Sequence, residues 1–216
     1  MKENDYIQKH KHIVFCVEHY NPLGVVRTLG ENGIQPELIV IRSSRIITSK
    51  SKYARICHFV NSIGEGYSYL LETYGHEESI PFVYTADDQI TNFLDSKYDE
   101  LNGKFYFYNA GQAGRVAEFQ NKDNILKLAK RHGLQYLKTF AVDVGEIPEG
   151  LEYPIITKAI ISTIDNWKGD MIICHNESEL REAYKKIRSP RVLLQKYIEK
   201  KNELCLEGVS VNKGNH

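Results

Sequence analysis

The sequence predicts a mixed fold in which a parallel α/β domain precedes an α+β domain. Over the first hundred residues, short apolar runs alternate with helical segments through short joints, which is typical of parallel strand–helix–strand units. In the second half, strands dominate and mostly follow one another through hairpin connections. The pattern changes near residues 110–120, so we expect one domain over residues 1–115 and a second over residues 116–216.

The first domain opens with a strand, a helix and a second strand. HIVFCVEH (12–19) is short, apolar and rich in β-branched and aromatic residues, which indicates a buried strand. In the following YNPLGVVRTLGENGI, Asn21 is suited to cap a helix, Pro22 fits its first position and Gly33 ends it. ELIVIRS (37–43) then predicts the next strand.

The same pattern recurs further along this domain. RICHFV (55–60) and PFVYTADD (81–88) are strand-like, and residues 66–74 between them favour a helix. We expect Asp87 or Asp88 to cap the helix that follows, and a catalytic role is the alternative. Residues 21–24 lie just past the first strand, where open α/β sheets bind ligands, but they lack a GxGxxG pattern. A plain turn and helix cap is therefore the preferred interpretation there.

The second domain begins after an aromatic and glycine-punctuated connector, FYFYNAGQAGRVAEF (105–119). NKDNILKLAKRHGL (121–134) has helical spacing and a stop at Gly133. Lys122 lies in its first turn, where a cation opposes the helix dipole. A bound anion or a nearby carboxylate would explain this lysine, and an ordinary exposed lysine is the alternative. The remaining predicted elements are strands at 139–143, 153–161, 171–175, 191–198 and 202–212 and a helix at 176–187.

The most informative stretch of this domain is YPIITKAII (153–161), an apolar run with Lys158 in its middle. Desolvating an unpaired charge costs several kcal/mol, so a buried ammonium group needs a partner, and an anionic ligand is the obvious one. In the alternative interpretation, Lys158 lies on the wet face of an edge strand and extends its charge into water.

Bulk composition excludes several classes of function. With 28 basic and 28 acidic side chains, the chain has no charge excess that would indicate nucleic acid or an anionic membrane as its main partner. No apolar run approaches the roughly 18 residues needed to span a bilayer, and the start of the chain is polar. The four cysteines form no CxxC pair, which argues against a zinc site. We therefore expect a soluble, cytoplasmic protein.

The order of these parts resembles the ATP-grasp superfamily of carboxylate–amine ligases. The resemblance covers the whole chain: a strand followed by YNPLGVVRTLGENGI, the helix NKDNILKLAKRHGL, the strand YPIITKA, a lysine- and glycine-bearing loop, and LLQKYIEKKNELCLEG. In detail the chain is most similar to the branch of D-aspartate ligases and carbamoyl-phosphate-synthase-like proteins. The resemblance implies a parallel α/β pre-ATP-grasp domain followed by a partial ATP-grasp domain that is truncated at its C-terminal end.

The resemblance also implies a set of ATP-binding residues. Lys122 and Lys158 match lysines that contact nucleotide phosphates, and Glu203 matches the acidic residue that holds the ribose hydroxyls. The stretch QKYI matches the adenine-binding hinge, where the Lys196 carbonyl would accept from the adenine amino group and the Ile198 amide would donate to the ring. The complete implied set is Lys122, Lys158, Lys168, Gly169, Gln195, Lys196, Tyr197, Ile198 and Glu203.

Two departures from the family pattern stand out. The hinge begins with Gln195 where glutamate is common, and the loop at 162–170 is poor in glycine, so that only Lys168 and Gly169 are placed to wrap phosphates. We expect this loop to close over phosphate. Family members continue past the position of His216, the last residue here, with their magnesium ligands. We therefore expect the chain to be a fragment with no catalytic residue and no metal ligand of its own, the metal ligands lying beyond His216.

The implied reaction is ATP-dependent and needs Mg²⁺. A substrate carboxylate forms an acyl phosphate, which an amine or similar nucleophile converts to an amide-type bond. The expected partners are therefore small-molecule carboxylates and amines, with a homodimer as the default assembly. Two alternatives remain open: a non-catalytic module that binds a nucleotide or small ligand, and a two-domain α/β protein unrelated to nucleotides.

Overall fold

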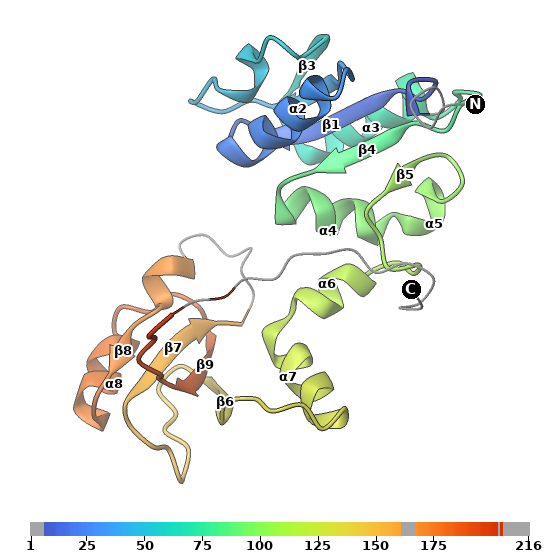
Figure 1. Ribbon diagram of the computed structural model, residues 1–216. Helices are drawn as coiled ribbons and strands as arrows, with labels where there is room; N and C mark the ends of the chain where they lie inside the picture. The colour runs from blue at the N-terminus through green and yellow to red at the C-terminus, as the bar shows by residue number, and fades with distance from the viewer. Residues whose placement is uncertain (1–6, 161–166, 203, 205–216) are drawn as a thin grey trace. The chain divides into compact units, whose positions relative to one another are not determined.

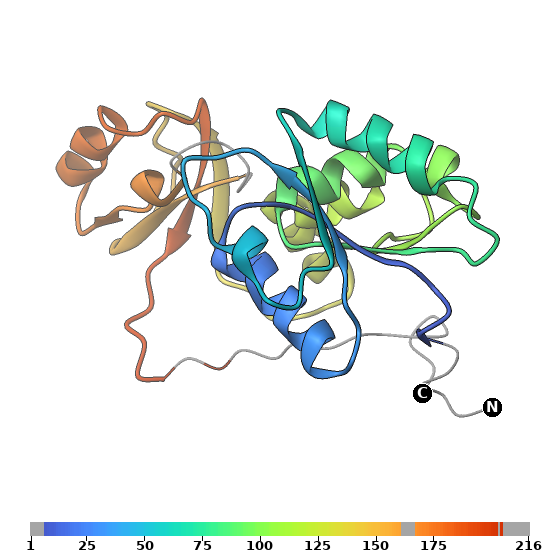
Figure 2. The ribbon, with the colours of Figure 1, turned by 90° about the horizontal axis from the view of Figure 1, so that it is seen from above.

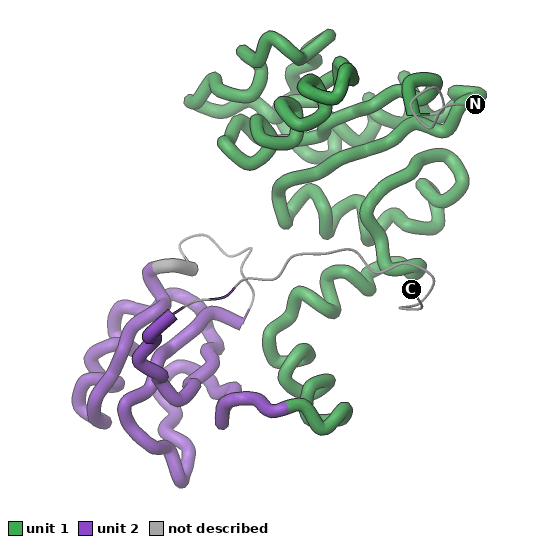
Figure 3. The backbone as a smooth tube through the Cα atoms, viewed as in Figure 1, with its two compact units in different colours: residues 1–134, 161–165 green, residues 135–160, 166–216 purple. Residues whose placement is uncertain are grey.

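The computed structural model describes residues 7–160, 167–202 and 204. The chain divides into two compact units, which Figure 3 shows in different colours: unit 1 comprises residues 1–134 and 161–165, and unit 2 comprises residues 135–160 and 166–216. The predicted boundary at 115/116 follows the change in sequence pattern. The compact units divide later in the chain because a helix over Arg115–Gln120 contacts the unit 1 helix over Asp88–Ser96 as well as the helix that follows it.

Unit 1 is built on a five-stranded parallel sheet (Figure 1). Its strands have the order β3-β2-β1-β4-β5, so the chain reverses its direction of travel across the sheet after β3. The central β1 pairs in parallel with β2 on one side and with β4 on the other. The bounds are β1 (His12–Val17), β2 (Glu37–Ile41), β3 (Ile56–Val60), β4 (Phe82–Thr85) and β5 (Tyr106–Phe107).

Helices cover both faces of this sheet, because alternate residues of the apolar strands point to opposite sides. Ile13 and Phe15 of β1 pack in one core with α3 and α4, whereas Val14 and Cys16 pack in a second core with α2. Figure 2 shows α2 and α3 on opposite sides of the strands. The helices are α2 (Tyr20–Glu31), α3 (Ile63–Tyr74), α4 (Asp88–Ser96), α5 (Tyr98–Leu101), α6 (Arg115–Gln120) and α7 (Lys122–Arg131), with the 3-10 turn η1 (Thr48–Lys50).

The helix starts agree with the prediction in one case and differ in another. Asp87 caps α4, because its carboxylate accepts from the amides of Gln89 and Ile90 at 2.9 and 3.1 Å. In α2, however, the cap is His19 rather than Asn21, and the Asn21 amide donates to His19 Nδ1 at 3.3 Å. The helix begins earlier than predicted because an extended histidine can cap through its ring nitrogen.

Unit 2 is an antiparallel sheet with the order β6-β9-β7-β8. Alternate residues of its strands pack with α8 in a separate core that includes Ile155, Leu180 and Leu194. The predicted hairpin between the Lys158 strand and the next is confirmed, with Ile155 opposite Cys174. The bounds are β6 (Thr139–Asp143), β7 (Ile155–Ala159), η2 (Trp167–Asp170), β8 (Ile173–Cys174), α8 (Glu177–Tyr184) and β9 (Arg191–Lys196).

Four sequence predictions fall partly or wholly outside the described residues. They are the strand at 202–212, the ribose-binding role of Glu203, most of the loop at 162–170, and the magnesium ligands expected beyond His216. His216 itself also lies outside the described residues. Within the residues that the structure describes, no helix is both long enough and apolar enough to cross a membrane.

Candidate functional site

One face of the unit 2 sheet carries two of the residues predicted to bind ATP, Lys158 and Gln195. Along β7, Ile155, Thr157 and Ala159 are buried, whereas Lys158 between them is half-buried. This alternation follows from the two-residue period of a strand and turns Lys158 away from the core beneath α8. We call this the lysine face; its members are Ile156 and Lys158 of β7, Leu193 and Gln195 of β9, and Thr139 and Ala141 of β6.

A chain of hydrogen bonds crosses the lysine face. Lys158 Nζ donates to Gln195 Oε1 at 2.7 Å, and Gln195 Nε2 donates to Thr139 Oγ1 at 2.9 Å. The ammonium group has no acceptor atom, so it must meet the amide oxygen of Gln195, and the amide nitrogen is left to face Thr139. Gln195 therefore connects three strands and orients Lys158.

The charge of Lys158 is poorly compensated. Burial lowers the pKa of Lys158 below its ordinary value of 10.5, and the positive charge of Lys200 lowers it further. Among the residues that the structure describes, Lys158 makes no ion pair with a carboxylate. A half-buried cation with only an amide partner is a group that an anionic ligand would stabilise.

The hinge at the end of β9 leaves main-chain groups available. The Lys196 amide donates to the Lys138 carbonyl at 3.2 Å, and the Tyr197 amide donates to the Pro154 carbonyl at 2.9 Å. Between described residues, no hydrogen bond uses the Lys196 carbonyl or the Ile198 amide. These are the two groups that the family resemblance predicts to contact the edge of adenine. The Ile198 side chain is 52% exposed, so it also offers an apolar surface beside them.

The Lys196 side chain contacts a carboxylate, whereas its carbonyl is one of the groups predicted to bind adenine. Its Nζ lies 3.4 Å from Glu152 Oε2, and Lys138 Nζ lies 3.5 Å from Oε1 of the same carboxylate. Hydrogen bonding to Lys196 and the charge of Lys138 lower the pKa of Glu152 below its ordinary value. Because the side chains of Lys138, Glu152 and Lys196 are all exposed, we expect these ion pairs to add little stability. Their expected role is to hold the end of β9 in place where the hinge begins.

Lys168 and Gly169 lie in η2, which follows the loop between β7 and β8. The end of this turn is anchored: Asp170 is buried, its carboxylate accepts from the amides of Arg188 and Ser189 at 3.2 Å, and its carbonyl accepts from Thr157 Oγ1 at 2.6 Å. Gly169 itself is exposed. The phosphate-binding role of Lys168 and Gly169 stays a prediction.

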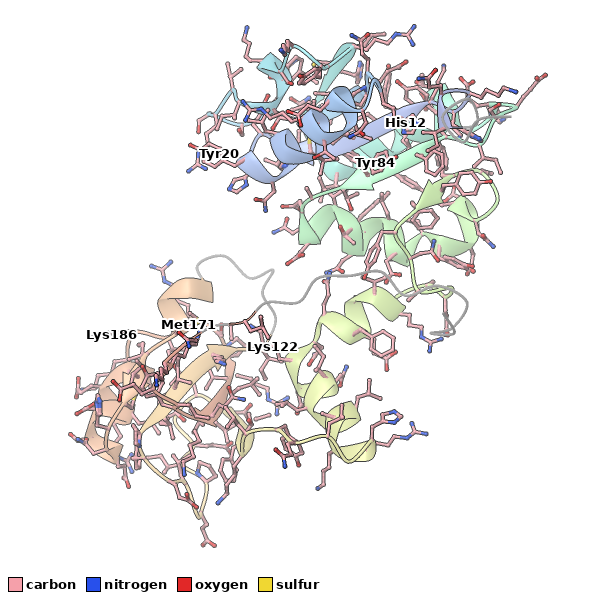
Figure 4. The ribbon with its side chains drawn as sticks, viewed as in Figure 1. His12, Tyr20, Tyr84, Lys122, Met171 and Lys186 are labelled. Carbon is pink, nitrogen blue, oxygen red and sulfur yellow. The ribbon has the colours of Figure 1, made fainter. Side chains whose placement is uncertain are left out.

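Lys122 is the first residue of α7, as predicted (Figure 4). The helix is capped by Asn121, whose side-chain oxygen accepts from the amides of Asp123 and Asn124 at 3.0 and 3.3 Å. Lys122 belongs to unit 1 and Lys158 to unit 2. The convergence of their two ammonium groups on one phosphate group therefore stays a prediction.

Sequence reasoning missed Thr139 as a member of the lysine face. Thr139 lies 56 positions before Gln195 in the chain, and only the register of β6 against β9 brings the two side chains together. The sequence shows the strand but not its register, so no signal in the sequence alone would have found this contact.

Comparisons with known proteins establish the fold. No protein-family model matches the chain, and no curated protein matches it. Among solved structures, the chain is similar to an L-amino acid ligase from Bacillus licheniformis, with a TM-score of 0.65 and 13% identity over 88% of this chain and 44% of that chain. N5-carboxyaminoimidazole synthetase from Staphylococcus aureus, complexed with ADP, is similar with a TM-score of 0.65 and 16% identity over 88% and 48% of the two chains.

A third similar structure is the biotin carboxylase domain dimer of 2-oxoglutarate carboxylase from Hydrogenobacter thermophilus, in complex with MgADP, ADP and bicarbonate. Its TM-score is 0.59, with 19% identity over 86% of this chain and 44% of that chain. The chain therefore spans about half the length of the structures it matches. The predicted fold class, a parallel α/β domain followed by an α+β domain, is confirmed.

Proposed function

We propose that the chain is part of an ATP-dependent ligase of the ATP-grasp type, which joins a carboxylate to an amine or a similar nucleophile. The observation that carries this proposal is the lysine face, where a half-buried ammonium group without a carboxylate partner among the described residues lies one strand away from the hinge. The fold that the chain shares with an L-amino acid ligase and with a synthetase complexed with ADP supports it. The resemblance of the sequence assigns the chain to the branch of D-aspartate ligases and carbamoyl-phosphate-synthase-like proteins.

The residues present fit the adenine end of the nucleotide. Adenine presents an amino donor next to a ring acceptor, and the hinge presents the Lys196 carbonyl and the Ile198 amide in the complementary order. Main-chain groups of this kind read a base edge without any special side chain, which explains how glutamine can stand at position 195. In this proposal Gln195 and Tyr197 shape the hinge, and Glu203 holds the ribose.

The phosphate end is assigned to Lys122, Lys158, Lys168 and Gly169. Lysines there would offset the charge that develops on the transferred phosphoryl group, and this positioning and neutralisation is the main contribution of the protein.

Mg²⁺ enters with the nucleotide in this proposal. Within the described part of the chain, no group of three or more His, Cys, Asp or Glu side chains could hold a metal ion. The resemblance of the sequence places the magnesium ligands beyond His216, and this position stays a prediction.

The proposed reaction proceeds through an acyl phosphate. The substrate carboxylate attacks the terminal phosphorus of ATP and ADP leaves, and the amine then attacks the carbonyl carbon of the acyl phosphate and displaces phosphate to leave an amide-type bond. No side chain of this chain forms a covalent bond to substrate in this scheme. The proposal includes small-molecule substrates, a cytoplasmic location and a homodimer as the default assembly.

The test is a screen of amino acid pairs for stimulated ADP release by the parent protein. We expect release that depends on one carboxylate and one amine together and that is lost in Lys158→Met. Nucleotide binding without ADP release from any pair would favour the non-catalytic binding module instead. Failure to bind ATP or ADP at millimolar concentration would contradict both.

A further inference from the structure

Unit 1 contains a cavity of about 390 Å³ at the carboxyl ends of its strands, and its described lining includes none of the residues assigned to ATP. Glu18 follows β1, Arg42 follows β2, and Phe59 lies in β3. The loop after β2 supplies the rest of the wall, including Arg45, Ile46 and Lys50. Open α/β sheets bind ligands beyond the carboxyl ends of their strands, and the volume lies in the range of small-molecule sites.

Three cations line this cavity without acidic partners. Within the described ranges, Arg42, Arg45 and Lys50 make no ion pair. Arg42 instead lies over the ring of Phe59, with its guanidinium carbon 5.2 Å from the ring centroid. The chain as a whole has 28 basic and 28 acidic side chains, so this excess of positive charge is local to the cavity. Such a local excess would attract an anionic ligand.

Among the described residues that line this cavity, Glu18 is the one carboxylate, and its oxygens already accept hydrogen bonds from the main chain. Glu18 is 3% exposed, and its Oε2 accepts from the amides of Ile47 and Thr48 at 2.8 and 2.6 Å. Burial alone would raise the pKa of Glu18, but hydrogen bonds from residues 47–49 lower it below its ordinary value. Glu18 is therefore ionised and committed to the main chain, so it does not serve as the partner of the three cations.

The same carboxylate fixes the shape of the cavity. By holding three successive amides, Glu18 fastens the loop that carries Arg45, Ile46 and Lys50 to the end of β1. Thr48 adds a second attachment, because its Oγ1 donates to the His19 carbonyl at 2.8 Å. A loop fixed before the ligand arrives loses less conformational freedom on binding.

We propose that this cavity binds a small organic anion, a carboxylate or a phosphate attached to a short apolar body. The cations would hold the anionic group, and Ile46 and Phe59, which are 64% and 37% exposed, would contact the apolar body. The inference does not rest on the proposed function, because it uses residues of unit 1 alone and requires no nucleotide.

The experiment uses the isotope-labelled chain and follows its backbone amides by NMR. Phenyl phosphate and phenylacetate share an aromatic body and differ in their anion, and 2-phenylethanol has a similar body without charge. We expect both anions at millimolar concentration to shift the amides of residues 42–50, and the alcohol to leave them in place. The anion that binds with the higher affinity shows whether the cavity prefers a phosphate or a carboxylate. Equal shifts with the alcohol, or no shift at these residues with either anion, would overturn the proposal.

Variants separate a built site from general surface charge. Lys50→Gln and the double variant Arg42→Gln/Arg45→Gln each remove charge from the cavity, whereas Arg27→Gln removes an exposed charge from α2 in the same unit. We expect the double variant to weaken binding at least about tenfold, Lys50→Gln to weaken it less, and Arg27→Gln to leave it unchanged. An Arg27→Gln effect as large as that of the double variant would show that the anion responds only to net charge, and the proposal would fail.

Discussion

Replacing Lys158 by methionine tests whether this residue serves ligand binding or the fold. Methionine keeps an apolar stem of similar length between the buried Thr157 and Ala159 and removes only the ammonium group. The variant loses one hydrogen bond, that from Nζ to Gln195 Oε1 at 2.7 Å, and Gln195 keeps its bond to Thr139. It also removes the cost of holding a desolvated charge.

These two changes oppose each other, so we expect the free energy of unfolding to stay within about 1 kcal/mol of the wild-type value or to rise slightly. The affinity for ADP should behave differently. A charge-assisted hydrogen bond to phosphate contributes about 1.5–3 kcal/mol, so its loss should weaken ADP binding by roughly 10- to 150-fold. In this account, Lys158 contributes to ligand affinity and does not contribute to the stability of the fold.

Urea unfolding and calorimetric titration with MgADP provide the two measurements. Lys185→Met is the matched control, because Lys185 is exposed on unit 2 and, among the residues that the structure describes there, its ammonium group forms an ion pair with Glu182 alone. The control should change neither quantity appreciably. A Lys158→Met variant that loses more than about 2 kcal/mol of stability but binds ADP normally would refute the reasoning and identify a structural lysine.

Three further predictions concern stability. First, because the pKa of Lys158 is lower in the folded state than its ordinary 10.5, the unfolded chain binds more protons in the window between the two values. The wild type should therefore gain stability relative to Lys158→Met as the pH rises through that window, and parallel pH profiles would contradict this. Second, Glu18→Ala should cost about 3 kcal/mol, because buried amides lose their acceptor. The pKa of Glu18 is lowered from 4.5, so its contribution is present above that pH and is lost as the pH falls through the folded value; urea titrations at pH 7 and at acid pH should converge for wild type and variant. Third, Gly66→Ala should destabilise by about 1–3 kcal/mol despite the better helix propensity of alanine, since its Cβ would lie 2.5 Å from Phe15 Cζ in the core. A stabilised Gly66→Ala protein in thermal unfolding would show that Phe15 can move aside.

The order of elements could be predicted because it depends on local patterns. The apolar runs at HIVFCV and ELIVI are short, β-branched and bounded by polar residues, and both are buried parallel strands. Asp87 caps its helix as expected, since an aspartate before a helical period has a strong local preference. The exact start of α2 was missed because histidine is a rarer cap.

Contacts between distant residues could not be predicted. Lys158 was recognised as unusual, but its partner Gln195 lies 37 positions away and is brought to it by the register of β7 against β9. Glu18 and the amides of residues 47–49 are separated by about 30 positions, so neither the anchored loop nor the cavity beside it could be inferred. The one available signal was the pair of arginines, Arg42 and Arg45, that follows a strand directly.

The central claim is that nucleotide binds at the hinge and on the lysine face of unit 2. The most direct measurement is a titration of the isotope-labelled chain with MgADP, followed at the amide of Ile198 and at the side-chain nitrogen of Lys158. The account predicts saturable shifts of both signals. The Ile198 amide signal should shift because this amide donates a hydrogen bond to a ring nitrogen of adenine. Saturable binding that moves neither signal and perturbs only residues of unit 1 would contradict the account.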